Sequence, residues 1–241
     1  TEVLAGNSAE GIFELCYDDS RGEYKDFGSY IGGTVEKWPV LKGTTPASRR
    51  KFFIRNETVE RLYTPEDLRL QAYFADFFRM KEEPVSVTQG AAYVRMWREV
   101  EYYSGGIYDG TPRTLLANDI LIRLPDILLL RAEMKAATGD REGAVADLDV
   151  VRRRAGVAGY SEAEGDLRRA IQLERDRELL FQTGVRYFDY MRNHTYNLLK
   201  GGFRDLTETD VAAGALFLPV SLDAMNNNPK VKQTAYWVGK F

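Results

Sequence analysis

The sequence is poor in the residues that bind metal ions and form disulfides. It holds one cysteine, Cys16, and one histidine, His194, among 241 residues. A lone cysteine excludes an internal disulfide. One histidine with one cysteine also falls short of the ligand set that a structural zinc site needs.

Long apolar runs, an excess of one charge and catalytic motifs are missing as well. No stretch approaches the ~18 apolar residues of a membrane-spanning helix, and the opening TEVLAGNSAEG lacks the basic and apolar regions of a signal peptide. A formal net charge of −3 argues against a nucleic-acid partner. The motifs GxGxxG, GxSxG, HExxH and CxxC do not occur, so the sequence predicts no cofactor. Because the chain does not start with methionine, we expect it to begin inside a longer protein.

The second half of the chain is patterned for helices. LIRLPDILLLRAEMKAATGD has Pro125 at a helix start and Gly139 at its end, and REGAVADLDVVRRRAG follows and ends at Gly156. The short link predicts an antiparallel hairpin over residues 125–154. The small and apolar residues of a tetratricopeptide-type unit are Ala132, Ala144 and Leu148.

A third helix is predicted from about residue 162 to 181, and it directs carboxylates inward. Leu167, Ile171, Glu174, Glu178 and Phe181 share one stripe at the helical spacing. A buried carboxylate needs a partner or a raised pKa. Glu133 is expected to face inward in the same way on the first helix. The arginines predicted as ion-pair partners are Arg123, Arg152, Arg175 and Arg186.

Two interpretations of these inward glutamates compete. They form structural ion pairs that hold the helices together, or they form the acid and base of a glycosidase-type site. We favour the structural interpretation, because ion-pair networks also perturb carboxylates.

The first half of the chain is richer in loops. GIFELCYD alternates as a strand does, and a glycine-rich stretch over residues 17–45 follows it. Loops of this length within a domain are often functional. Trp38, Tyr30 and Tyr24 on this loop suit stacking on a flat ligand face; the alternative is that these rings pack onto the helices.

Several of these segments, in this order, resemble the SusD/RagB family of nutrient-binding lipoproteins. SAEGIFELCYD resembles the segment before the family's variable ligand loop, and TPEDLRL its Asp-x-Arg element. NDILIRLPDILLLRAEMKAATGD, LDVVRRRAG and LERDRELLFQTGVRYFDYMR resemble its framework helices, with Gln182 and Thr183 where the pattern has glutamate before Gly184. FLPVSLDAMNNNPKVKQTAYW matches its closing segment, which we expect to be ordered coil anchored by Leu218, Tyr236 and Trp237.

The resemblance implies a binding protein and not an enzyme, with a mainly α, irregular helical fold and long ligand-binding loops. Residues 1–241 would be the C-terminal part of such a domain. Residues 1–115 would be loop-rich, with the ligand loop at 17–45, and residues 116–241 would form the helical framework and a C-terminal coil. The expected ligand-binding residues are Trp38, Tyr30, Tyr24, Asp18 and Asp19.

The same resemblance implies a place and partners. Members of the family lie on the extracellular face of the outer membrane as lipoproteins and cap a SusC-like TonB-dependent transporter. The lipid anchor and most of the helical repeats would belong to an N-terminal half outside this chain, whose docking surface would remain here as an exposed apolar patch. Oligosaccharide capture is the first hypothesis, and peptide capture is the second. An enzyme that uses Asp18, Asp19 or Glu23 and a purely structural helical module are the remaining alternatives.

Overall fold

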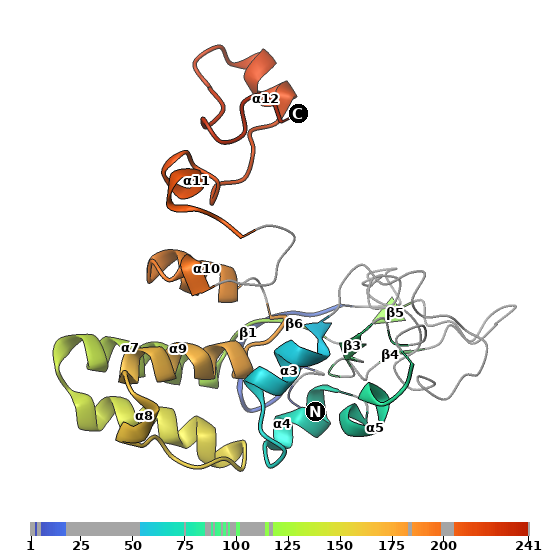
Figure 1. Ribbon diagram of the computed structural model, residues 1–241, viewed down its shortest axis with the longest axis vertical. Helices are drawn as coiled ribbons and strands as arrows, with labels where there is room; N and C mark the ends of the chain where they lie inside the picture. The colour runs from blue at the N-terminus through green and yellow to red at the C-terminus, as the bar shows by residue number, and fades with distance from the viewer. Residues whose placement is uncertain are drawn as a thin grey trace, which may run out of the picture. The chain divides into compact units, whose positions relative to one another are not determined.

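The chain forms two units, Thr1–Thr183 and Gly184–Phe241 (Figure 1). The structure is a computed structural model. It describes residues 3, 6–17, 54–74, 76–84, 88, 90–92, 94, 96, 100–101, 114–115, 118–182, 185–198 and 205–240.

The first unit is built on a helical hairpin of α7 (Leu124–Thr138) and α8 (Arg141–Arg154). Gly139 ends α7 at φ +91°, in the left-handed region that favours glycine. Asp140 then caps α8 by accepting a hydrogen bond from the Gly143 N–H at 2.9 Å. The predicted hairpin and its tetratricopeptide-type contacts are therefore confirmed. Its fully buried small and apolar residues are Ala132, Ala144 and Leu148.

Helix α9 (Leu167–Glu178) packs against this hairpin, and it is shorter than the sequence predicts. Residues Glu162–Glu164 form a separate 3₁₀ turn, because Gly165 at φ +87° breaks the helical path before Asp166 caps α9. The helix also ends before Phe181, whose φ is +59°. The inward stripe therefore holds for four of its five residues, namely Leu167, Ile171, Glu174 and Glu178.

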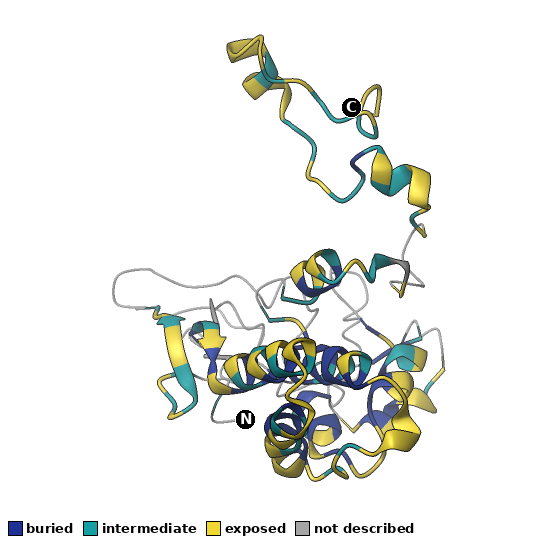
Figure 2. Cartoon of the chain, turned by 90° about the vertical axis from the view of Figure 1, so that its left-hand side faces the viewer, coloured by how far each residue is buried: buried dark blue, intermediate teal, exposed yellow. Residues whose placement is uncertain are grey.

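A group of short helices precedes the hairpin. They are α3 (Asn56–Leu62), α4 (Leu68–Tyr73) and α5 (Phe77–Lys81). Phe74, fully buried, lies between the rings of Tyr63 and Phe77, with centroids 5.8 and 6.2 Å away. These helices form one apolar core, and α7, α8 and α9 enclose a second. Figure 2 shows buried positions on the inner sides of the helices and exposed positions on their outer sides.

The strands in the described part of the chain are short and pair two by two. The pairs are β1 (Gly11–Leu15) with β6 (Asp119–Arg123), β2 (Ile54–Arg55) with β3 (Ala91–Ala92), and β4 (Val100–Glu101) with β5 (Thr114–Leu115). The fold is mainly α, as predicted. The β1–β6 register shifts on both sides of Phe13, and Ile12 and Phe13 are therefore both exposed despite their neighbouring positions.

The second unit carries α10 (Val185–Arg192), α11 (Glu208–Ala212) and α12 (Leu222–Asn227), with a 3₁₀ turn at Tyr196–Leu198. The Trp237 indole N–H donates to the Phe217 carbonyl at 2.7 Å, and the Tyr236 N–H donates to the Ala213 carbonyl at 2.8 Å. Leu218 is 86% exposed, so the prediction that it anchors the closing segment is wrong. The other two predicted anchors, Tyr236 and Trp237, hold the segment through these hydrogen bonds.

Candidate functional site

In the sequence, the predicted ligand loop lies between strands β1 and β2 of the first unit. β1 ends at Leu15, and the next strand, β2, begins at Ile54. The predicted ligand contacts belong to the intervening segment and lie outside the described residues, so their role stays a prediction. These residues are Trp38, Tyr30, Tyr24, Asp18 and Asp19.

Both ends of that segment are tied to the framework. The Tyr17 hydroxyl donates to Asp119 Oδ2 at 2.6 Å, and this hydrogen bond raises the pKa of Tyr17 to about 12. At the other end, Ile54 is buried and pairs with Ala92, and the Asn56 N–H donates to the Gly90 carbonyl at 3.0 Å. The framework therefore holds the described residues on either side of this segment, Tyr17 and Ile54.

A buried cluster of arginines and carboxylates joins the two cores of the first unit. Arg69 on α4 lies at its centre and is 5% exposed. Its Nη1 lies 2.7 Å from Glu174 Oε1 and 3.1 Å from Glu178 Oε2, while its Nη2 lies 2.7 Å from Asp67 Oδ2. One guanidinium thus connects the short helices to α9 with all charges paired.

Three guanidinium groups contact the carboxylate of Glu178. Arg123 Nη1 lies 2.5 Å from Glu178 Oε1, and Arg154 and Arg69 also contact the carboxylate. Burial alone would raise the pKa of this carboxyl, but Arg123, Arg154 and Arg69 outweigh burial and lower the pKa to about 2. Glu178 is therefore ionised throughout the ordinary pH range.

Glu174 is held in the same way from the side of α8. Arg152 Nε and Arg177 Nη1 both lie 3.2 Å from its Oε2. Arg152 also pairs with Glu164 at 2.8 Å, and Arg177 Nε donates to the Leu62 carbonyl at 2.5 Å. The cluster therefore extends from α3 through α9 to the turn before it.

The structure places the other predicted ion-pair residues at different points. Arg175 pairs with Asp126 on α7 at 2.7 Å, a partner that the sequence analysis left out. Glu133 is buried on α7, and Arg186 lies over the ring of Tyr190 at 5.4 Å. The ion-pair roles of these last two residues stay predictions.

Arg69 is the central residue that sequence reasoning missed. A signal for it was present, because Arg69 lies one turn before Tyr73 on the buried face of α4 and two residues after the Asp67 N-cap. An arginine in the middle of an apolar helix face needs a carboxylate partner. The segment TPEDLRL therefore indicates a buried ion pair, as the inward-facing glutamates do.

This cluster is suited to holding the fold together and not to acid–base chemistry. A glycosidase-type general acid needs a carboxyl with a raised pKa, which stays protonated near neutral pH. The arginines around Glu178 lower the pKa of its carboxyl, so this carboxyl does not stay protonated near neutral pH. In the described part of the chain, no group of three or more histidine, cysteine, aspartate or glutamate residues is arranged to hold a metal ion.

A cavity of ligand size lies among the described residues of each unit. A cavity of about 470 Å³ in the first unit borders the charge cluster at Asp67, Arg152 and Arg177. These three side chains are engaged in the ion pairs of the cluster.

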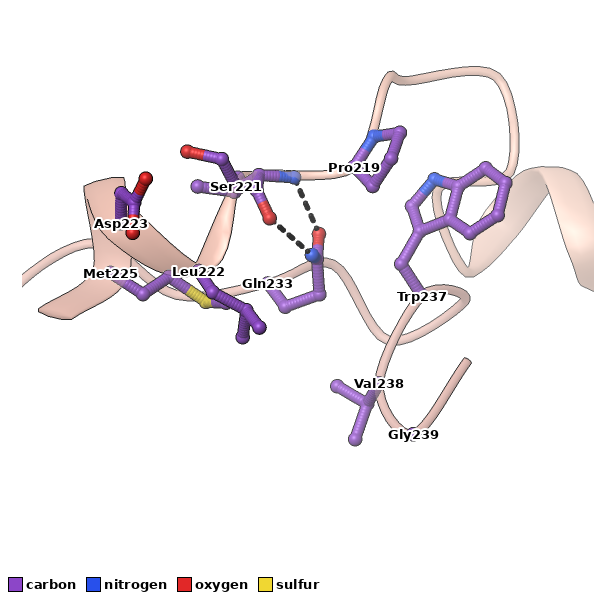
Figure 3. Close-up of a pocket in the computed structure, with 10 residues that line it drawn as sticks. Pro219, Ser221, Leu222, Asp223, Met225, Gln233, Trp237, Val238 and Gly239 are labelled. Carbon is purple, nitrogen blue, oxygen red and sulfur yellow. Dashed lines mark hydrogen bonds between the residues drawn. The ribbon is translucent and has the colours of Figure 1, made fainter. Parts of the chain in front are cut away.

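The cavity in the second unit is larger, about 710 Å³, and Figure 3 shows Pro219, Leu222 and Trp237 around it. Its central polar residue, Gln233, hydrogen-bonds both backbone groups of Val220 at 3.1 and 3.0 Å. Gln233 therefore holds two stretches of the closing segment together, and its amide is not free for a ligand.

None of the helices in the described ranges has the length and apolar composition to cross a bilayer. A tetratricopeptide-like hairpin is joined by a buried charge cluster to a group of short helices, so the described part of the first unit is a mainly helical framework. The SusD family matches residues 9–237, and the chain belongs to this family. No curated protein matches.

Solved structures agree with this assignment. A SusD homologue from Bacteroides thetaiotaomicron has a TM-score of 0.77 and 25% identity, over 98% of this chain and 48% of that one. Surface glycan-binding protein A from the same species, in complex with laminarihexaose, has a TM-score of 0.68 and 19% identity, over 97% and 54% of the two chains. NanU from Bacteroides fragilis has a TM-score of 0.61 and 20% identity, over 97% and 52%. The chain therefore spans about half the length of these relatives.

Proposed function

We propose that this protein captures oligosaccharides at the cell surface and delivers them to a TonB-dependent outer-membrane transporter. The match to the SusD family over residues 9–237 carries the proposal. Two structures of surface glycan-binding protein A from Bacteroides thetaiotaomicron, one of them in complex with laminarihexaose, support a glycan as the ligand. In this proposal the protein is an extracellular lipoprotein of the outer membrane, and its anchor lies in an N-terminal half.

The proposed ligand site is the aromatic loop between β1 and β2. One face of a sugar ring carries C–H groups, and stacking that face on an indole or phenol buries apolar area while the hydroxyls stay hydrated. Stacking of bases on aromatic rings contributes ~1–3 kcal/mol each, and we take this as the scale for sugars. One ring alone would give millimolar affinity at best. The proposed site therefore combines Trp38 with Tyr24 and Tyr30, and Asp18 and Asp19 supply hydrogen bonds.

A panel of oligosaccharides and peptides tests this function on the full-length protein. Retarded migration in a gel that contains the polysaccharide, with no product after incubation, is the expected result. Binding of peptides alone would replace the glycan with a peptide ligand. Release of shorter sugars would show an enzyme and contradict the proposal.

Delivery to a transporter needs a separate test. The full-length protein, isolated from its native outer membrane under mild detergent, should co-purify with a TonB-dependent transporter. Its isolation alone, with an intact lipid anchor, would leave glycan capture in place and remove the transporter from the proposal.

A further inference from the structure

The cavity of about 470 Å³ in the first unit lies between three parts of the chain that hydrogen bonds tie together. Arg177 Nε on α9 donates to the Leu62 carbonyl at 2.5 Å, and the Tyr63 hydroxyl donates to the Arg177 carbonyl at 2.7 Å. The Leu68 N–H donates to the Ala155 carbonyl at 3.0 Å, which ties the start of α4 to the end of α8. The shape of the cavity therefore depends on contacts within the chain, as in most small-molecule sites, which are largely preformed.

The charges that line this cavity are not balanced. Its lining includes three carboxylate and two guanidinium side chains, namely Glu66, Asp67, Glu164, Arg152 and Arg177. Four of the five have ion-pair partners in the buried cluster. The exposed side chain of Glu66 has no hydrogen bond or ion pair within the described part of the chain. The lining therefore carries one uncompensated negative charge, which favours a cationic ligand.

Two more polar groups of the lining are available to a ligand. The Thr64 side chain is exposed and makes no hydrogen bond among the described residues. Arg177 uses its Nε on the Leu62 carbonyl and its Nη1 on Glu174, and its Nη2 has no partner among those same residues. A threonine hydroxyl donates and accepts, whereas a guanidinium nitrogen only donates. Hydroxyl groups on a ligand would satisfy both.

We propose that this cavity binds a small molecule that carries an ammonium group beside hydroxyl groups, as an amino sugar does. The ammonium group pairs with Glu66, one hydroxyl accepts from Arg177 Nη2, and another exchanges a hydrogen bond with Thr64. The C–H groups of the sugar ring lie against the apolar wall at Val157. These residues lie outside the proposed glycan loop at 17–45, so the amine site can fail without affecting glycan capture.

Titrations of the full-length protein, followed by the NMR signals of the ligand, test this ligand class. Glucosamine is the probe, glucose lacks its amine, and cyclohexylamine lacks its hydroxyls. We expect glucosamine to bind about fivefold more tightly than either control, which is the upper range for an exposed ion pair. Added salt should weaken glucosamine binding, because it screens that pair. Equal affinity for glucosamine and either control, or no binding of glucosamine, would overturn the proposal.

Substitutions in the full-length protein locate the bound amine. Glu66→Gln should weaken glucosamine binding about fivefold, and Thr64→Val should weaken it by a smaller factor. Glu142→Gln changes an exposed carboxylate on α8 outside the cavity and should keep full affinity. Unchanged affinity in Glu66→Gln, or an equal loss in Glu142→Gln, would show that the amine binds elsewhere and would overturn the site. A protein that binds oligosaccharides but not glucosamine would overturn this site alone.

Discussion

Arg69 and Glu174 are 105 residues apart in the sequence, and their side chains meet at 2.7 Å in the buried centre of the first unit. This contact links α4, which belongs to the core around Phe74, to α9, which belongs to the core of the hairpin. The Arg69 guanidinium is therefore one of the polar links between the two cores.

Replacing Arg69 with methionine should destabilise the protein by about 3–5 kcal/mol, because the buried carboxylates of Asp67, Glu174 and Glu178 lose a shared partner. Urea denaturation measures the loss. Arg79→Met is the matched control: the Arg79–Asp76 pair is more than half exposed, so the urea midpoint should not move. Equal effects of the two substitutions would contradict a central role for Arg69.

Stability should fall as the pH drops from about 4.5 towards 2. The pKa of Glu178 is about 2 in the folded protein, below its usual value of 4.5. A carboxyl with a lowered pKa stabilises the fold above its unfolded-state pKa, and this stabilisation is lost as the folded carboxyl takes up its proton. The expected loss is on the order of 3 kcal/mol.

Denaturation curves measured across this pH range separate Glu178 from the other acids. Glu178→Gln should lower stability at neutral pH and flatten the dependence between pH 4.5 and 2. Glu162→Gln removes an exposed partner of Arg141 and should leave the slope close to that of the parent protein. A slope that is unchanged in Glu178→Gln would show that other carboxyls govern acid stability.

Two helix-ending glycines should respond differently to alanine. Gly139 has φ +91° and open space where a Cβ would be, so Gly139→Ala should cost about 1 kcal/mol of backbone strain. Gly156 has φ +74°, and a Cβ there would lie 3.0 Å from Leu68 Cγ. Gly156→Ala should therefore lower the melting temperature further than Gly139→Ala does.

A double variant checks the cause of that difference. Leu68 is 59% exposed, so Leu68→Ala alone should change little. Combined with Gly156→Ala it should bring the loss back to the size seen for Gly139→Ala. Simple additivity of the two substitutions would show that the Leu68 contact is not responsible.

Trp38→Ala in the full-length protein should weaken glycan binding about tenfold or more and leave stability nearly unchanged, on the stacking scale used above. Calorimetry with the oligosaccharide chosen from the panel measures the affinity. Phe188→Ala, which removes an exposed ring from α10, is the control and should keep full affinity. A large loss of stability in Trp38→Ala would place the indole in the core and not in a ligand site.

Local signals predicted the hairpin well. The ends of the helices at Gly139 and Gly156 and the close packing at Ala132 follow from glycine's tolerance of positive φ and from side-chain size, which act within a few residues. The inward direction of Glu174 and Glu178 followed from helical spacing in the same way.

Relationships between distant segments were harder to predict. The spacing around Glu178 does not say that Arg69 reaches it, because that contact depends on how α4 packs on α9. The end of α9 before Phe181 is also set by tertiary contacts. The Arg123 guanidinium and the Tyr73 hydroxyl bind the Glu178 carbonyl at 2.5 and 3.1 Å, where a continuing helix would place its own N–H. The ligand loop has no helical or strand period, so its sequence predicts aromatic content but not ring positions.

The order of the cluster along the chain has a consequence for folding that starts from the N-terminal end. Arg69, Arg123 and Arg154 are all made before Glu178, the carboxylate that they share. Until Glu178 emerges, closing the first unit would bury cationic groups without this counter-charge, which is unfavourable. A chain that ends before α9 should therefore leave the short helices and the hairpin incompletely packed, and a protease should cleave it readily.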